Sequence, residues 1–186
     1  MQDLINIFDT HSHYDDPRFD GVREELVASL FDRGISGLIH AAVDFKSSEY
    51  GTAAAKSYEK YYAAVGIHPE NLYDAQGDYI NRLREAALSC KKVVAIGEIG
   101  LDYHYEGYDR EAQIKVFREQ IVLANELSLP IIVHCRDAVG DCMDILRELK
   151  PKGVMHCFSG SEETAKEVSE AQNSVNTRIN AIYDGL

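Results

Sequence analysis

The stretch Asp9-Thr10-His11-Ser12-His13 follows directly on the short apolar run of residues 4–8. In extended backbone, residues two positions apart project from the same face, so both imidazoles of this stretch can point at one spot. Two neutral imidazoles at the end of a strand are good ligands for zinc, manganese or iron, but they supply only half of a coordination shell. The alternative is a pair of loop histidines that only make hydrogen bonds, and the rest of the chain has to decide between the two.

The size and composition of the chain indicate one globular domain. The sequence has 186 residues, of which 45% are hydrophobic, which is enough to bury a core. No apolar segment approaches the roughly 20 residues that a membrane helix needs. The sequence shows no pattern typical of a secretory signal, and the spacing of its four cysteines does not suggest disulfides. We therefore expect a cytoplasmic protein with reduced thiols and no contact with a membrane.

The formal net charge of -12 argues against a broad basic surface that grips a nucleic-acid backbone. It does not exclude a nucleic-acid substrate, because part of the charge can belong to metal-binding carboxylates. Bound divalent cations make a pocket locally positive inside an acidic protein. Such a substrate would be bound at a site and not along a face.

Short apolar strands alternate with amphipathic helices along the chain. We expect strands at residues 4–8, 37–43, 61–65, 93–96, 131–133 and 153–155. The helices between them include one that Asp109 caps and a last one that begins at a capping box of Ser159 and Glu162. This alternation predicts an α/β fold with parallel strands. The first strand is not followed by a glycine-rich phosphate loop, which favours a TIM-type (β/α)8 barrel, with about six units in this chain, over an open nucleotide-binding sheet.

Polar side chains follow these strands at their carboxyl ends, which in a parallel barrel form one rim. The residues are His11 and His13 after strand one, His68 after strand three, Glu98 after strand four, His134 after strand five and His156 after strand six. Their shared position favours a metal site over separate structural roles. Glu98 can bridge two cations, and two such cations generate hydroxide and neutralise a phosphoryl transition state. A carboxylate that forms a salt bridge or lies on the surface is the alternative.

Two further charged residues have two interpretations each. Arg136 lies two residues past His134, where its guanidinium can clamp phosphate oxygens; alternatively, it pairs with Asp137 or Asp141. Asp102 is either a partner of a metal ligand or a helix cap.

Other residues with functional potential stand beside these strand ends. Three tyrosines can stack on bases or cover the core: Tyr103, Tyr105 and Tyr108. His40 and His104 do not lie next to other candidate site residues in this pattern, and they stay structural or unassigned.

Five motifs in this order resemble the TatD family of metal-dependent deoxyribonucleases. They are DTHSH at 9–13, GIHP at 66–69, GEIGLD at 97–102, VHCR at 133–136 and HCFSGS at 156–161. The resemblance covers roughly the first 170 residues. It implies a closed eight-stranded barrel, two divalent metal ions (Mg, Mn or Zn), and hydrolysis of DNA with exonuclease character by a metal-activated water. The DNA would be single-stranded or bound at its ends.

The same resemblance assigns roles to individual residues. The metal ligands would be His11, His13, Glu98, His134 and His156. Glu98 would also be catalytic, and His68 and Arg136 would lie close to the substrate phosphate.

One departure from the family pattern bears on the whole chain. The family continues through two more strand–helix units with a Thr-Asp-x-Pro motif, and here residues 173–186 form an atypical tail without it. We therefore expect a single TatD-like hydrolase domain over 1–186 that is incomplete, with strands one and six as unpaired edges. Two alternatives stay open: an amidohydrolase-like metal hydrolase of another substrate, and a catalytically impaired remnant. The sequence leaves the oligomeric state undetermined.

Overall fold

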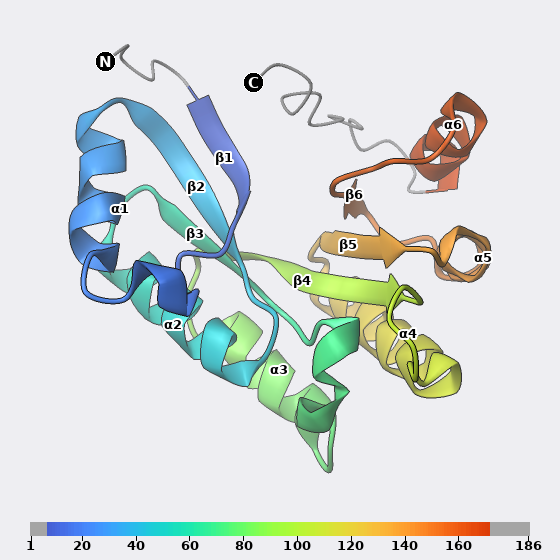
Figure 1. The fold of residues 1–186 in the computed structure, drawn as a ribbon. Coiled ribbons are helices and arrows are strands. Elements are labelled where there is room, and N and C mark those ends of the chain that lie inside the picture. Colours follow the sequence, from blue (N-terminus) through green and yellow to red (C-terminus); the bar gives the residue numbers. More distant parts are fainter. Residues whose placement is uncertain (1–6, 172–186) are drawn as a thin grey trace.

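Six parallel strands form one curled sheet in the computed structural model, which describes residues 7–171 (Figure 1). The strands are β1 (Ile7–Ser12), β2 (Ile35–Ala41), β3 (Tyr61–Val65), β4 (Val93–Asp102), β5 (Ile131–Arg136) and β6 (Gly153–Met155). They lie in the order β1-β2-β3-β4-β5-β6, and each pairs in parallel with the next. Strands that follow one another in sequence and in space are typical of a barrel, because each crossover adds one neighbour.

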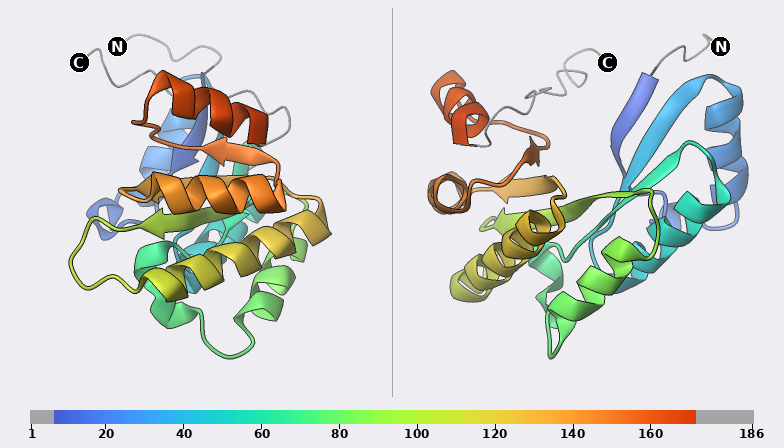
Figure 2. Two further views of the ribbon diagram at one scale, coloured as in Figure 1. Left: turned by 90° about the vertical axis from the view of Figure 1, so that its right-hand side faces the viewer. Right: turned by 180° about the vertical axis from the view of Figure 1, so that it is seen from behind.

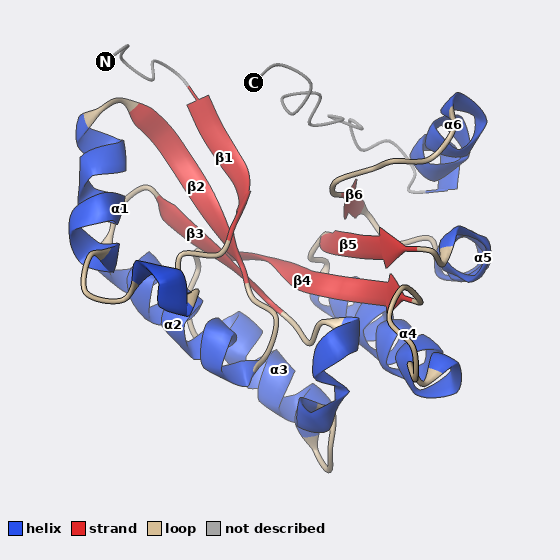
Figure 3. Cartoon of the chain, in the orientation of Figure 1, coloured by secondary structure: helices blue, strands red, loops and turns tan. Residues whose placement is uncertain are grey.

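The helices follow the strands and cover the convex side of the sheet (Figures 2 and 3). They are α1 (Arg23–Asp32), α2 (Phe45–Ser57), α3 (Tyr79–Leu88), α4 (Arg110–Leu127), α5 (Val139–Leu149) and α6 (Glu162–Ala171), with 3-10 turns η1 (Pro17–Phe19) and η2 (Pro69–Asp74). Among the described residues, no helix is both long and apolar enough to cross a membrane.

One of the two predicted helix caps is confirmed and the other is wrong. The Asp109 carboxylate accepts a hydrogen bond from the backbone N–H of Ala112 at 3.0 Å, as expected at the start of α4. At α6, the Ser161 hydroxyl accepts from the N–H of Thr164 at 3.3 Å. A capping side chain stands directly before the first helical residue, and Glu162 is itself that first residue, so the predicted box of Ser159 and Glu162 is out of phase.

Two hydrophobic layers of unequal size lie on the two faces of the sheet. The convex layer, between strands and helices, includes the fully buried side chains Leu38, Tyr61, Ile99, Phe117 and Leu146. The concave layer consists of Ala64, Ala95 and Ile132, with Ile39 and Val154 partly covering them. Most of the burial that stabilises the fold is therefore on the convex side.

The first and last strands are edges of the sheet, as predicted. Within residues 7–171, β1 pairs with β2 and β6 pairs with β5, and neither has a second neighbour. Phe8 on β1 is 42% exposed although its ring lies 5.9 Å from that of Tyr62. An apolar side chain is thus left at the open side of the curled sheet.

Four strands differ from their predicted bounds. β2 is Ile35–Ala41 where 37–43 was expected, and β5 runs on to Arg136 where 131–133 was expected. The differences in β1 and β4 lie next to the site. β1 is Ile7–Ser12 where 4–8 was expected, and residues 4–6 lie outside the described part, as does the tail at 173–186. β4 runs on through Glu98 to Asp102, where 93–96 was expected, because residues 99–102 pair with β5. In both strands the register shifts next to a site residue, between Asp9 and Ser12 and between Ile96 and Ile99. A shift of this kind re-aims side chains, and an apolar pattern does not reveal it.

His40, which the sequence left unassigned, is a buried side chain on β2. Its Nε2 lies 3.1 Å from Oγ of Ser47 on α2, and a Cβ at Gly51 would collide with the ring. Burial lowers the pKa of His40 to about 4, and Asp15, with its Oδ1 3.8 Å from Nε2, only partly opposes that shift.

This burial predicts a loss of stability in mild acid. The pKa of an unfolded histidine is about 6.5, so from that pH downward the unfolded chain binds a proton that the folded chain rejects until about pH 4. We expect the free energy of unfolding to fall by about 3 kcal/mol because of His40 as the pH drops from about 6.5 to about 4. Urea unfolding between pH 7.5 and 4.5, with chelator present, measures it.

His68 should add a similar pH dependence of stability, because burial also lowers its pKa to about 4. Comparison of variants therefore separates the contribution of His40 from that of His68. His40→Gln should have a shallower dependence of stability on pH than the wild type. His104→Gln is the matched control, because that exposed ring pairs with Asp137 on the surface. Equal pH dependence in His40→Gln and wild type would contradict the prediction.

Candidate metal centre

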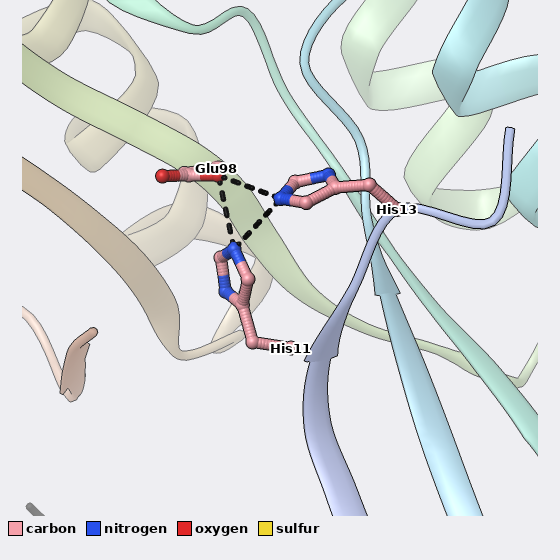
Figure 4. Close-up of side chains that lie close together, drawn as sticks. All are labelled: His11, His13 and Glu98. Atoms are coloured by element: carbon pink, nitrogen blue, oxygen red, sulfur yellow. Dashed lines mark hydrogen bonds and ion pairs between the residues drawn. The ribbon is translucent and has the colours of Figure 1, made fainter. Parts of the chain in front are cut away.

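The Glu98 carboxylate is the centre of the site, and it is 3% exposed. On one side, its Oε2 lies 3.1 Å from His11 Nε2 and 3.5 Å from His13 Nε2 (Figure 4). The two Nε2 atoms are 3.0 Å apart. The structure therefore brings both imidazoles of the opening stretch to one spot, with a carboxylate from β4 beside them.

The other oxygen of Glu98 faces a second set of histidines. Oε1 lies 3.0 Å from Nδ1 of His134, contacts Nε2 of His156, and lies 3.8 Å from Nε2 of His68. The ring of His156 also stacks on that of His11, with centroids 4.0 Å apart. The four histidines predicted as metal ligands thus gather around the carboxylate of the fifth predicted ligand, Glu98. His68, predicted beside the substrate phosphate, lies near enough to share a cation with Glu98 and His134.

Glycines allow β4 to carry Glu98 so close to β5. A Cβ at Gly97 would lie 2.7 Å from that of Ile132. Gly100 has φ of 153° and faces His134 across the two strands, and a Cβ there would collide with the carbonyl oxygen of His134. Side chains at either position would push β5, and with it the His134 ring, away from Glu98.

Charge at the site suits a cation. Burial disfavours the ionised form of Glu98, but hydrogen bonds from His11, His134 and His156 outweigh it and hold the pKa of that carboxyl well below its usual range. Burial, together with neighbouring histidines, lowers the pKa of His13 and of His68. The carboxylate is therefore ionised and these two imidazoles are neutral, which is the form that binds metal.

The spacing of the donor atoms also fits a metal ion. Ligands bound at about 2.0–2.1 Å, at tetrahedral or octahedral angles, lie about 2.9–3.4 Å from one another. The nitrogens of His11 and His13 and the nearer oxygen of Glu98 are separated by 3.0, 3.1 and 3.5 Å. The residues present thus fit a divalent cation. His68, Glu98 and His134 form a second such group, whose donor atoms lie within 4.8 Å of one another.

Asp102 holds the ring of His134. Its Oδ2 lies 2.8 Å from His134 Nε2, and its Oδ1 accepts from the N–H of His104 at 2.9 Å. The sequence left Asp102 as either a partner of a metal ligand or a helix cap. The structure favours the partner, because Asp102 contacts His134 and the cap of α4 is Asp109. Burial disfavours the charged form of His134, but its hydrogen bonds to Glu98 through Nδ1 and to Asp102 through Nε2 outweigh burial and raise its pKa. A cation bound at Nδ1 would replace the proton there, while the Asp102 carboxylate would keep the proton at Nε2.

Arg136 lies at the edge of the site. Its guanidinium donates to the hydroxyl of Tyr105 at 3.3 Å. The acidic partners considered for it are engaged elsewhere: Asp141 with Arg110 at 2.6 Å and Asp137 with His104 at 2.8 Å.

A cavity of about 690 Å³ opens over the centre. Glu98, His68 and Arg136 line it, together with residues that the sequence interpretation did not single out: Asp15, Asp44, Lys46 and Tyr50. Asp15, Asp44 and Lys46 lie within a few residues of the carboxyl end of β1 or β2. Their position after a strand, which identified the histidines in the sequence, could have identified these three residues as well.

The family model described as TatD related DNase matches residues 8–181. The chain belongs to this family. The TatD-family chain is 37% identical over 164 residues to the uncharacterized metal-dependent hydrolase YabD of Bacillus subtilis (strain 168), a match that covers 87% of this chain and 64% of that protein. It is 31% identical over 160 residues to the 3′-5′ ssDNA/RNA exonuclease TatD of Escherichia coli (strain K12), covering 84% and 61%. The chain thus spans less than two thirds of the length of these curated relatives.

A solved structure confirms the architecture of the TatD-family chain. The crystal structure of YJJV, a TatD homolog from Escherichia coli K12, superposes with a TM-score of 0.82 at 32% identity and covers 89% of this chain and 65% of that one. The predicted TIM-type barrel, with about six β/α units present, is therefore correct, as is the predicted family. The Bacillus subtilis relative is named as a metal-dependent hydrolase, which is in keeping with the cluster around Glu98.

Proposed function

We propose that this chain hydrolyses phosphodiester bonds of DNA, releasing nucleotides from single-stranded ends, with divalent cations held around Glu98. The observation that carries the proposal is that one buried carboxylate is shared by two groups of candidate ligands, His11–His13–Glu98 and His68–Glu98–His134. Two relatives are named as a metal-dependent hydrolase and as an exonuclease on single-stranded DNA and RNA, which supports this substrate class.

In this proposal, the metal ligands are His11, His13, Glu98, His134 and His156. Divalent cations held this way lower the pKa of water and offset the negative charge of a phosphoryl group undergoing attack. Two ions are expected, because Glu98 offers one oxygen to each side. The imidazole-rich donor set favours Zn or Mn over Mg, which prefers oxygen ligands.

Other side chains bind and orient the substrate. Arg136 can exchange its bond to the Tyr105 hydroxyl for charge-assisted bonds to phosphate oxygens. His68 stays neutral at pH 7 and offers Nε2 either to a cation or to a phosphate oxygen. Asp102 keeps the His134 ring in place while substrate enters and leaves.

We also infer that residues 1–186 belong to a single domain that works in the cytoplasm. The described part shares one convex core from β1 to α6, which supports the single domain. The cysteines at positions 90, 135, 142 and 157 are all free thiols, which is typical of a reducing compartment.

Metal removal and return test the proposed function. The chain stripped with EDTA should release no nucleotides from a 5′-labelled single-stranded oligonucleotide. Mn²⁺, and less effectively Mg²⁺, should restore a ladder of products shortened from one end. Atomic absorption on protein loaded with metal should find about two ions per chain. Carboxylic esters and amides, assayed beside DNA, should be poor substrates.

Three results would contradict the proposed function. They are nucleotide release that persists in EDTA, esters or amides cleaved faster than DNA, and protein that holds no metal and releases nothing. The last result would favour the impaired remnant.

A further inference from the structure

A second cavity, of about 330 Å³, lies beside the metal centre between η2 and the loop from β4 to α4. Glu70 and Asp102 line both this cavity and the larger one, so the two share a wall. Because Asp102 also binds the His134 ring, the second cavity begins one side chain away from the candidate metal ligands.

The walls of the second cavity are rich in aromatic rings. Tyr73, Tyr105 and Tyr108 line it, and all three are more than 40% exposed. Tyr108 stacks on Tyr103 with centroids 4.6 Å apart, and the Tyr103 hydroxyl donates to Asp141 at 2.7 Å, so this pair braces the loop. Tyr105 is 55% exposed and lines the second cavity, and its hydroxyl accepts a hydrogen bond from Arg136, which lines the larger one.

Arg136 links Tyr105 to the metal centre. Its guanidinium carbon lies 5.2 Å from the centroid of the Tyr105 ring, while its side chain lines the larger cavity. The ring of His104 packs at 81° to the tyrosine ring from another side. Tyr105 is thus held by two neighbours, and an ordered aromatic ring loses little conformational freedom when a second ring stacks on it.

Charge decides which part of a nucleotide suits this cavity. Its polar lining includes the carboxylates of Glu70, Asp102, Glu106 and Asp109. These carboxylates repel a phosphate but accept hydrogen bonds from the exocyclic amino groups of bases. We therefore expect the phosphate to bind at Arg136 and the candidate metal centre, and the planar base to bind against the tyrosines of the second cavity.

We propose that the second cavity is a nucleobase subsite, in which the base next to the phosphate at the metal centre stacks on Tyr105. The inference rests on the proposed function for the position of that phosphate. Stacking on one aromatic ring changes affinity by about 5- to 150-fold per base. It tolerates any base, because every base offers a flat face.

Oligonucleotides that lack one base test the subsite. A fluorescein-labelled single strand of ten nucleotides, protected by phosphorothioate linkages, carries a tetrahydrofuran residue in place of one of its last three nucleosides in turn. With Mn²⁺ present, fluorescence anisotropy gives the Kd of each strand. At one position, loss of the base should weaken binding to the wild type by about 5- to 150-fold.

Variants assign this effect to Tyr105. In Tyr105→Ala the ratio between abasic and intact strands should fall close to one, and in Tyr105→Phe it should stay as in the wild type, because the ring remains. Leu88→Ala, at a side chain that is 69% exposed on α3, is the matched control and should keep the wild-type ratio. Equal binding of all strands by the wild type, no binding at all, or an unchanged ratio in Tyr105→Ala would overturn the subsite.

Cleavage of unprotected strands, measured in parallel, separates this inference from the proposed function. A base preference that depends on Tyr105 without any cleavage would refute hydrolysis and keep the subsite. Metal-dependent cleavage without a base preference would support hydrolysis and refute the subsite.

Discussion

Replacing Glu98 by glutamine is expected to abolish binding of both proposed metal ions and to lower the proposed nuclease activity by more than about 100-fold. Loss of a residue that only supports a metal ligand costs up to about 100-fold, and loss of a shared ligand should cost more. The reason is the shared carboxylate. Its two oxygens face His11 and His13 on one side and His134 and His156 on the other, so an amide impairs both groups at once.

Isothermal titration with Mn²⁺ and metal analysis after dialysis measure this loss. His13→Gln should remove one ion and keep the other, because His13 contacts only Oε2 of Glu98. Glu85→Gln is the matched control, since it deletes an exposed carboxylate on α3, and it should bind metal as the wild type does. Wild-type stoichiometry and affinity in Glu98→Gln would refute the shared ligand.

Gly100→Ala is expected to destabilise the fold by at least about 3 kcal/mol and to weaken metal binding together with it. Gly100 has φ of 153°, where L residues are strained, and an added Cβ would overlap the backbone carbonyl of His134. Because β4 and β5 pair in this register, relief of the overlap has to move His134 away from Glu98.

The stability of Gly100→Ala is measured by urea unfolding, and its metal affinity by titration of the fraction that folds. Gly140→Ala is the matched control: the added Cβ would meet nothing within 4 Å on α5. It should be neutral or stabilise the helix by up to about 1 kcal/mol. Equal melting of Gly100→Ala and wild type would show that β5 can shift without cost.

Strand order and rim positions could be predicted because they depend on local patterns. Apolar runs with intervening amphipathic helices predicted each strand of residues 7–171, and the polar residues after five of the six runs predicted which side chains meet. Tyr61–Val65 and Gly153–Met155 have the expected bounds. These two strands are short and bounded by turn residues, which a sequence shows directly.

The fine geometry of the centre could not be predicted, because it depends on register. Whether Glu98 follows β4 or lies within it is decided by pairing with β5, which forms across 30 or more residues of sequence. The same pairing places Asp102 beside the ring of His134 and not on a helix. The approach of His68 to Glu98 likewise depends on how far the sheet curls between β3 and β4.

The unequal hydrophobic layers have a consequence for engineering. The cohesion of this fold resides on its convex side, where the helices pack, and of the loop between β4 and α4 only Tyr103 packs against that layer. The loop between β4 and α4 could therefore be exchanged for one of different length or chemistry while its two anchoring elements stay in place. Libraries built on that loop should retain a high fraction of folded members, which makes it the natural place to reprogram what this scaffold accepts.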